Sequence, residues 1–280
     1  MPRPLFFALL LLCALAFSAL AQVEAPGAPA SLDAAARVLR LDVTGAITPA
    51  QADALDNALD RCVREGFDLL VIRLDTPGGL NQSMRRMVKA MRTAEVPVAV
   101  WVGPQGAMAS SAGTFLVAAS HFSGMAPLTT IGSASPVTSG GEDMSDTMGR
   151  KVTGELVSLI TSIARAHGRN AEWYASAVTD AASLPAEEAV MQRVVECQAV
   201  SLGDFLAQAG TRGIEFRGEA LTFGPDVEMA TYEHGIRHRV LSWLLNPTVA
   251  YLLLLGGMAG LFFELTTPGA IFPGVFGGVC

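Results

Sequence analysis

Apolar and polar positions along the first part of the chain follow two periods, one typical of strands and the other of helices. Residues 37–47 (RVLRLDVTGAI) alternate between the two kinds of side chain, as a half-buried strand does. Residues 67–79 (FDLLVIRLDTPGG) contain a continuous apolar run, which predicts a strand buried on both faces of a parallel sheet. Between these strands, Thr48 and Gln51 have the spacing of a capping box, so we expect a helix over 49–65.

The succession of strands and helices continues beyond residue 80. We expect a helix over 81–94, a strand over 96–103, a helix over 103–121 and short strands within 122–137. Because strands and helices follow one another, the pattern predicts an α/β fold with parallel sheets and right-handed crossover helices.

A loop rich in Gly, Ser and Asp at 138–149 separates this part from three more helical segments. The apolar positions predict helices over 151–167, 170–181 and 185–193. The regular pattern ends near residue 225, so we assign a single domain to residues 36–225.

The N-terminal residues have the pattern of an export signal. Arg3 precedes an apolar run over 5–17, and residues 19–21 (ALA) form a small-residue cleavage signal. We therefore expect residues 1–21 to be a signal peptide and the Pro/Ala-rich residues 22–35 to be a linker. An uncleaved membrane anchor is the alternative.

The C-terminal residues predict a membrane region. No charged side chain occurs between Leu241 and Phe263, and such a length can cross the ~30 Å hydrocarbon layer of a bilayer. Apolar sequence broken by Gly and Pro then continues to Cys280. We expect residues 236–280 to form a membrane region with a transmembrane segment, cut short at its C-terminal end. A buried soluble helix is the alternative.

Composition narrows the classes of function. Hydrophobic residues make up 51% of the 280 residues, the mean hydropathy is +0.40 and the net charge is −7, which suits a chain that lies partly in a membrane. The sequence has no basic run, so nucleic-acid binding is not expected. No Cys/His spacing is typical of a metal site, and we expect no cofactor. Cys62 and Cys197 are expected to be buried rather than paired.

Residues 103–121 (GPQGAMASSAGTFLVAASH) contain the candidate nucleophile. Ser110 and Ser111 follow a strand and a turn and lie among Gly and Ala, which let a substrate approach closely. At the start of a helix, free N–H groups and the helix dipole favour the negative charge of an activated serine. The alternative is that both serines only cap the helix and pack.

A lysine suits the role of general base better than a histidine does. His121 lies ten residues beyond Ser111, ~15 Å along a helix, and we expect it at the helix C-terminus. The chain has 17 arginines and only two lysines, so a lysine that is kept suggests a role that needs a removable proton. Lys151 opens a helix, where its charge opposes the dipole, whereas Lys89 is expected to be solvated. An ordinary exposed lysine is the alternative for Lys151.

The end of the buried strand supplies candidate donors for an oxyanion. Gly78 and Gly79, in the stretch DTPGG, have no side chain that could block a carbonyl group, so their N–H groups could bind it. The N–H of Ala112 is the candidate second donor, because it follows the candidate nucleophile. A plain turn is the alternative.

Several stretches, in their order along the chain, resemble the NfeD family of membrane-bound serine proteases, within the Clp-protease/crotonase superfamily. They are RLDTPGGL (73–80), GAMASSAGTFLVAASH (106–121), MAPLTTIGSASPV (125–137), KVTGELVSLITSIARAHGRNAEW (151–173) and NPTVAYLLLLGGMAGLFFELTTPGAIFPGVFG (246–277). The resemblance implies a ClpP/crotonase-like fold followed by a transmembrane segment.

The resemblance also implies a Ser-Lys dyad. The family's nucleophile precedes Ala-Gly, which is Ser111 here, and its lysine opens the KVT helix, which is Lys151. Relatives with a Ser-His-Asp triad carry their histidine near Ala134, where this chain has none. One departure is residues 191–193 (MQR), which replace a turn that usually contains glycine.

Partners and location are likewise implied by the resemblance. Substrates would be hydrophobic segments of a membrane-associated partner, such as a stomatin-like protein. The expected location is the bacterial inner membrane, with the protease domain on the extracytoplasmic side, and the expected assembly is a homodimer or a higher homo-oligomer.

Two other classes of function remain open. A non-catalytic membrane scaffold could use the same fold to bind a stomatin-like partner, and the reactivity of Ser111 would distinguish it from a peptidase. A crotonase-type acyl-CoA enzyme is disfavoured, because CoA chemistry is cytoplasmic whereas the chain carries an export signal.

Overall fold

A computed structural model describes residues 30–31, 35–136, 146–233, 247–266 and 275. The expected signal peptide at 1–21, nearly all of the linker and most of the loop at 138–149 lie outside the described residues. The first part of the expected membrane region lies outside them as well.

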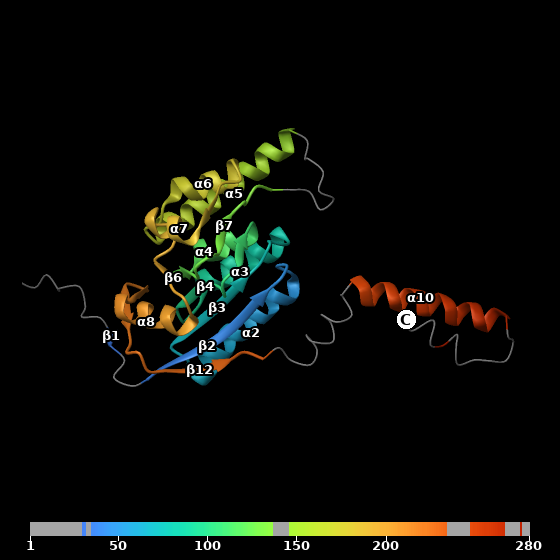
Figure 1. The fold of residues 1–280 in the computed structure, drawn as a ribbon, viewed down its shortest axis with the longest axis horizontal. Helices are drawn as coiled ribbons and strands as arrows, with labels where there is room; N and C mark the ends of the chain where they lie inside the picture. Colours follow the sequence, from blue (N-terminus) through green and yellow to red (C-terminus); the bar gives the residue numbers. More distant parts are fainter. Residues whose placement is uncertain (1–29, 32–34, 137–145, 234–246, 267–274, 276–280) are drawn as a thin grey trace, which may run out of the picture.

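A parallel six-stranded sheet forms the centre of the described part (Figure 1). Every neighbouring pair in it is parallel, which confirms the predicted α/β fold with crossover helices. In spatial order its strands are β12 (Val227–Thr231), β2 (Ala36–Thr44), β3 (Leu69–Asp75), β4 (Val98–Val102), β6 (Phe122–Met125) and β9 (Cys197–Gln198).

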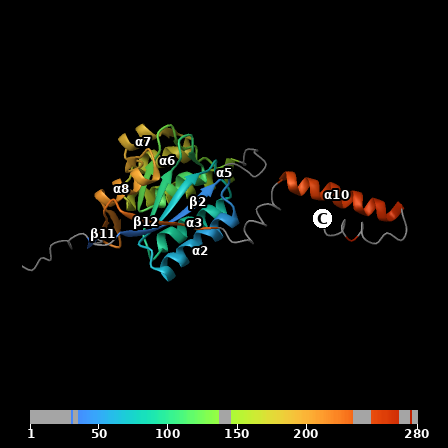
Figure 2. The same cartoon turned by 60° about the horizontal axis from the view of Figure 1, so that its bottom comes forward.

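The side chains of β3 alternate between two apolar cores, one on each face of the sheet. Leu70, Ile72 and Leu74 belong to the larger core, and Leu69 and Val71 belong to the smaller one. The larger core is covered by α2 (Pro49–Glu65), α3 (Asn81–Thr93), α4 (Ala112–Ala119) and α5 (Asp146–Ala166). The smaller core is covered by α8 (Leu202–Arg212), on the other side in Figure 2. Burial on both faces is what the continuous apolar run in this strand predicts.

A second layer lies beside the C-terminal ends of the central strands. It contains a three-stranded sheet, within the described residues, of β5 (Met108–Ser110), β7 (Thr130–Gly132) and β8 (Ser183–Pro185). Helices α5, α6 (Ala171–Thr179) and α7 (Ala186–Met191) lie in this layer (Figure 1).

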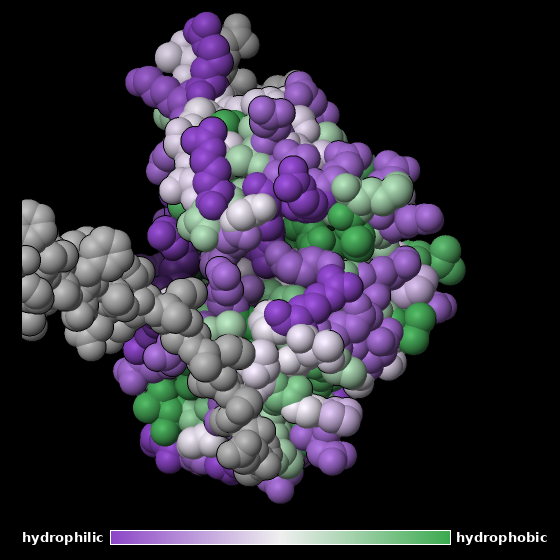
Figure 3. Space-filling model, turned by 90° about the vertical axis from the view of Figure 1, so that its left-hand side faces the viewer, coloured by the Kyte–Doolittle hydropathy of each residue, from purple (hydrophilic) through white to green (hydrophobic). Residues whose placement is uncertain are grey.

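Two further groups of strands complete the domain. A small sheet is formed by β1 (Ala30–Ser31), β11 (Glu219–Thr222) and β10 (Ile214–Phe216). β12 lies beyond residue 225, where we expected the domain to end, and it adds an edge strand to the central sheet. The face of the body seen in Figure 3 is mainly hydrophilic, with small apolar areas between the polar residues.

The helix expected over 49–65 is confirmed at both ends. The Thr48 side chain accepts a hydrogen bond from the N–H of Gln51 at 3.4 Å, as the capping box predicts. The helix ends at Gly66, whose φ of 68° is a left-handed conformation that suits glycine.

The helix expected over 103–121 is wrong for its first half. Residues 108–110 form β5 and pair with β7, and α4 begins only at Ala112. Local composition favoured a helix, but the N–H and C=O groups of this segment bond to Thr76 and to β7 instead. The helix also ends at Ala119, so His121 is not a helix residue.

The last described helix, α10 (Pro247–Thr266), exposes apolar side chains. They are Tyr251, Leu252, Leu254, Leu255, Met258, Leu261, Phe262 and Phe263. Within the described residues, no helix combines the length and the apolar character that a membrane crossing requires.

Candidate active site

Ser111 occupies a strained turn between β5 and α4. Its φ of 51° and ψ of −113° are unusual for a residue with a side chain. The turn is held by the N–H of Ser111, which donates to the carbonyl of Gly132 at 2.9 Å. The buried hydroxyl of Thr114 donates to the carbonyls of Ala109 and Gly132 at 2.9 and 3.0 Å. A serine on a sharp turn from strand to helix has the geometry of a nucleophile elbow.

The Ser111 side chain is available for chemistry. It lies at the N-cap position but makes no capping hydrogen bond, and the residue is partly exposed whereas all of α4 is buried. Ser110 is also partly exposed, but it lies within β5 and its N–H donates to Thr76. The backbone geometry therefore distinguishes the two serines, which the sequence pattern alone did not.

The glycine turn after β3 lies directly against Ser111. A Cβ atom on Gly78 would be 2.7 Å from Ser111 Cβ and 3.2 Å from its Oγ, and Gly78 has a φ of +123°. A Cβ on Gly79 would overlap the backbone of Ile47, with which Gly79 forms a β-bridge. Only glycine fits either position, so the structure brings the predicted turn and the predicted nucleophile together.

The three candidate oxyanion donors differ in their hydrogen bonds. The N–H groups of Gly79 and Ala112 have no acceptor among the described residues. The N–H of Gly78 instead donates to the Thr76 hydroxyl at 3.1 Å, and this hydroxyl donates to the carbonyl of Gly78 at 3.1 Å. The sequence reasoning missed Thr76; a threonine two residues before a glycine is typical of a local side-chain turn.

The helix that we expected Lys151 to open begins five residues earlier, at Asp146, so this expectation is wrong. Lys151 lies in the second turn of α5, where the helix dipole acts on its charge more weakly, and its side chain is exposed. Within the described part of the chain, no hydrogen bond or ion pair joins it to Ser111. The proposed dyad therefore stays a prediction. Lys89 is exposed on α3, as we expected of a solvated lysine.

The two histidines that the structure describes, His121 and His167, lie together at the other end of the central strands. His121 accepts a hydrogen bond from the N–H of Val98, the first residue of β4, at 3.0 Å. Its ring centroid is 5.6 Å from that of His167. Burial lowers the pKa of both rings, that of His167 to about 4, with a further contribution from the positive charge of Arg169.

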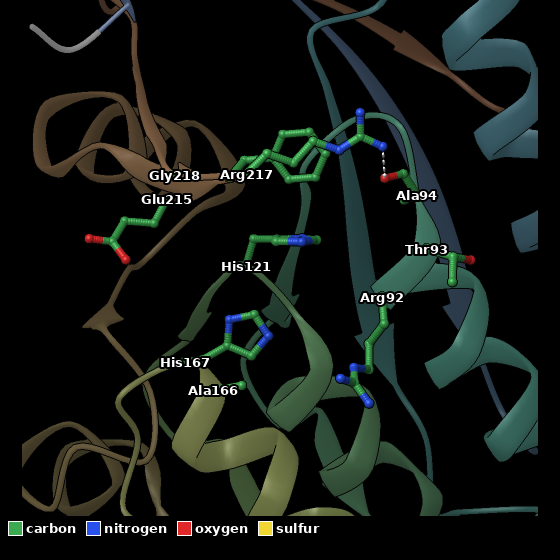
Figure 4. Close-up of a pocket in the computed structure, with 10 residues that line it drawn as sticks. Arg92, Thr93, Ala94, His121, Ala166, His167, Glu215, Arg217 and Gly218 are labelled. Carbon is green, nitrogen blue, oxygen red and sulfur yellow. Dashed lines mark hydrogen bonds between the residues drawn. The ribbon is translucent and has the colours of Figure 1, made fainter. Parts of the chain in front are cut away.

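These histidines line a pocket of about 360 Å³ (Figure 4). In the figure Glu215 and Arg217 point away from the paired histidines, and Arg217 donates to the carbonyl of Ala94 at 3.2 Å. None of the residues predicted for the active site lines this pocket.

Cys62 and Cys197 are free and buried, as expected. Burial raises the pKa of each thiol to about 12, so neither is a reactive thiolate near neutral pH. In the part of the chain that the structure describes, no group of three or more His, Cys, Asp or Glu side chains could hold a metal ion.

The fold and the serine turn define a class of protein: an α/β domain built on a parallel sheet, with a serine exposed on a strained turn beside a double glycine. Residues 37–208 match the N-terminal domain of NfeD1b, and residues 248–280 match the NfeD integral membrane domain. The chain therefore belongs to the NfeD family, and the second match places part of it in the membrane.

One curated protein and two solved structures are similar to this chain. The chain is 31% identical over 241 residues to the membrane-bound protease PH1510 of Pyrococcus horikoshii, a match that covers 85% of this chain and 55% of the relative. The chain thus spans about half the length of the curated relative it matches.

Two solved structures of the 1510-N membrane-bound stomatin-specific protease have similar folds. One is a variant with a lysine replaced by alanine, in complex with a substrate peptide; it is 28% identical, with a TM-score of 0.68 over 75% of this chain and 98% of that one. The other is a variant with a serine replaced by alanine, also 28% identical, with a TM-score of 0.66 over 72% of this chain and 100% of that one.

Proposed function

We propose that the protein is a membrane-anchored serine endopeptidase that cleaves hydrophobic segments of a membrane-associated partner such as a stomatin-like protein. The observation that carries this proposal is the strained turn of Ser111, packed against Gly78 and next to unused N–H groups. A structural serine has no need of such a turn, whereas a nucleophile needs an exposed hydroxyl beside oxyanion donors.

In the proposed mechanism, Ser111 Oγ attacks the scissile carbonyl and its proton passes to Lys151 Nζ. The oxyanion accepts hydrogen bonds from the N–H groups of Gly79 and Ala112. Gly78 can add its N–H if it leaves the Thr76 hydroxyl. The protonated lysine then gives its proton to the leaving amine, and water hydrolyses the acyl-enzyme.

The mechanism requires Lys151 to reach Ser111 when substrate is bound. Catalytic hydrogen bonds are often formed only in the substrate complex, so an exposed Lys151 is compatible with the proposal. The solved relatives support it, because a serine and a lysine are the residues replaced in their two variants.

The remaining parts of the proposal concern the whole protein. We propose a signal peptide at 1–21, a protease domain over 36–225 to which β12 (Val227–Thr231) adds an edge strand, and a membrane region over 236–280 with a transmembrane segment. The domain would lie on the extracytoplasmic side of the inner membrane, as a homodimer or a higher oligomer. The stomatin specificity of the similar protease supports a stomatin-like partner.

The experiment that tests the nucleophile compares two neighbouring serines in the full chain in detergent. Ser111→Ala should lower peptide cleavage by about 10⁴-fold or more, and Ser110→Ala should only reduce it. Loss of cleavage in Ser110→Ala with activity kept in Ser111→Ala would reverse the assignment.

The base is tested with the two lysines of the chain as a matched pair. Lys151→Arg should lower the rate by about 10²–10⁴-fold, because arginine keeps the charge but cannot accept a proton. Lys89→Arg, also an exposed helical lysine, should leave the rate unchanged. An active Lys151→Arg enzyme would end the dyad proposal.

A non-catalytic scaffold is the second candidate, favoured because no hydrogen bond or ion pair joins Ser111 to Lys151 among the described residues. A fluorophosphonate probe distinguishes the two, since it reacts with activated serines without needing the correct peptide. Labelling of Ser111 supports the peptidase, and a folded protein without labelling supports the scaffold.

A further inference from the structure

Three helices end near the pocket of Figure 4, and each leaves carbonyl groups without helical partners at its C-terminus. A positive charge near such an end stabilises the helix. α3 carries Arg92 and α5 carries Arg165 in their own last turns. Of the two arginines that line the pocket, Arg92 is therefore explained by the end of its own helix.

α4 differs because it carries no basic residue in its last turn. Its sequence, AGTFLVAA, is apolar apart from one threonine, and all eight residues are buried. The charge comes instead from Arg169, which lies outside the helix. The Arg169 Nη1 donates to the carbonyls of Val117 and Ala118 at 2.7 and 2.9 Å.

The rest of the Arg169 guanidinium is also fully used. Nε and Nη2 bind the two carboxylate oxygens of Glu196 at 2.8 and 2.9 Å, and Nη2 also donates to Ser120 Oγ at 3.3 Å. The Arg169 side chain is only 2% exposed. A guanidinium has five N–H donors in a fixed plane, so these contacts define its orientation.

Glu196 connects this cluster to the central sheet. One of its oxygens accepts hydrogen bonds from the N–H and the hydroxyl of Ser123 in β6, at 2.6 and 2.7 Å. Glu196 itself directly precedes β9, the neighbouring strand. Arg169 therefore ties the C-terminal end of α4 to two strands of the sheet.

The other end of α4 carries Ser111, eight residues away and thus ~12 Å along the helix. A short rigid helix transmits a shift at one end to the other, and a misplacement of about 1 Å can cost 10²-fold in rate. We propose that Arg169 is a positioning residue for Ser111: it acts through α4 and holds the nucleophile in register with Gly79 and Ala112. The inference rests on the proposed peptidase function.

The test distinguishes a positioning role of Arg169 from a purely stabilising one. It replaces both Arg169 and Glu196 with uncharged residues. Arg169→Met combined with Glu196→Gln removes both charges, so neither is left buried alone, and keeps an oxygen that can accept from Ser123. In the full chain in detergent, we expect this variant to fold and to label with fluorophosphonate at least about ten-fold more slowly than wild type. kcat for a peptide should fall by a similar factor while KM changes little.

Arg169→Lys provides a second variant in case the double variant does not fold. Lysine keeps the charge but cannot make the planar set of contacts, so we expect a smaller loss of labelling rate with the charge retained. The matched control is Arg86→Met with Asp56→Leu, which removes an ion pair between α3 and α2 that does not touch α4; it should label at the wild-type rate.

The outcomes distinguish the two hypotheses. If wild-type Ser111 does not label, the peptidase proposal fails and the positioning proposal fails with it. If wild type labels and the folded Arg169 variants label equally fast, Arg169 is structural only and the positioning proposal alone is overturned. A fall in rate with an unchanged control supports it.

Discussion

The two ends of α4 differ in whether their polar groups are hydrogen-bonded. At the N-terminal end, Ser111 has a strained backbone, its side chain makes no capping bond, and the N–H of Ala112 has no acceptor among the described residues. At the C-terminal end, the carbonyls of Val117 and Ala118 are bound by a buried guanidinium. Strain persists only where the surrounding structure over-determines it. We therefore infer that the hydrogen bonds at the C-terminal end of α4 help to hold the strained turn at its N-terminal end.

The largest expected effect is a loss of stability from a substitution at the C-terminal end of α4. Arg169→Met alone leaves Glu196, whose side chain is 27% exposed, without its charged partner. It should lower the free energy of unfolding by up to about 3 kcal/mol, the low end of the cost of breaking a buried pair, because Glu196 keeps some contact with solvent. Denaturant unfolding of the full chain in detergent measures this. Arg86→Met removes an exposed arginine from its ion pairs and should cost about 1 kcal/mol or less. Equal losses in the two variants would contradict the special role of the buried pair.

The next largest effect is a loss of activity from a substitution beside the N-terminal end of α4. Gly78→Ala places a methyl group 2.7 Å from Ser111 Cβ and should lower peptide cleavage by about 10²-fold, because the serine must shift. The control is Gly218→Ala, which also has a positive φ, of +86°, but whose new methyl group meets nothing within 4 Å. Both variants should lose about 1 kcal/mol of stability, and only Gly78→Ala should lose activity. A fully active Gly78→Ala enzyme would contradict the proposed site.

A smaller effect is the dependence of stability on pH, which comes from His167 near the C-terminal end of α4. The pKa of His167 is about 4 in the folded protein and about 6.5 when unfolded. Between these values the unfolded chain binds the proton and the folded one does not, so stability is present above pH ~6.5 and falls as the pH drops toward 4. Thermal melting from pH 7.5 to 4.5 should show this slope, and His167→Gln should flatten it. An unchanged slope in the variant would show that other groups cause it.

A pH series extended below 4.5 should show a second, more acidic loss of stability, caused by Glu196. Burial raises the pKa of Glu196, but the charge of Arg169 outweighs this and lowers it below its ordinary value. The stabilisation from this carboxylate is therefore present above its unfolded pKa of about 4.3 and is lost as the pH falls further. This step should survive in His167→Gln and disappear in the charge-free double variant.

The smallest expected effect is a gain in stability rather than a loss. Arg193 has a φ of 55°, a left-handed conformation, and lies in the segment 191–193 (MQR). Arg193→Gly should stabilise the protein by up to about 1 kcal/mol, because the backbone strain of a left-handed residue exceeds the entropy cost of glycine. Arg193→Ala removes the same side chain but keeps the strain, so it should show no gain in melting temperature. Stabilisation by both variants would point to the side chain instead.

Periodicity predicted most of the central sheet and its helices because their burial follows local pattern. The run in 67–79 became a strand buried on both faces, and the Thr48 capping box opened its helix. The start of α4 was mispredicted, because residues 108–110 have no apolar period of their own and became a strand only by pairing with β7.

In the candidate site, too, some residues could be predicted from local sequence and others could not. Ser111, the glycine turn and Lys151 could be singled out from residue types and their order. Thr76 was missed although its turn with Gly78 is local. Arg169 could not be singled out, since its role depends on contacts to residues distant in the sequence. Nothing local shows that Arg169, rather than another of the 17 arginines, is buried.

The sequence by itself determined the α/β class, the buried strands, the serine and the glycine turn, because hydrophobic period and turn chemistry act over a few residues. Only the tertiary structure decided which serine carries the strained backbone, that Gly78 touches it, and that α4 receives its C-terminal charge from Arg169. Those features depend on segments that meet only when the chain folds, where close packing and buried hydrogen bonds set the geometry.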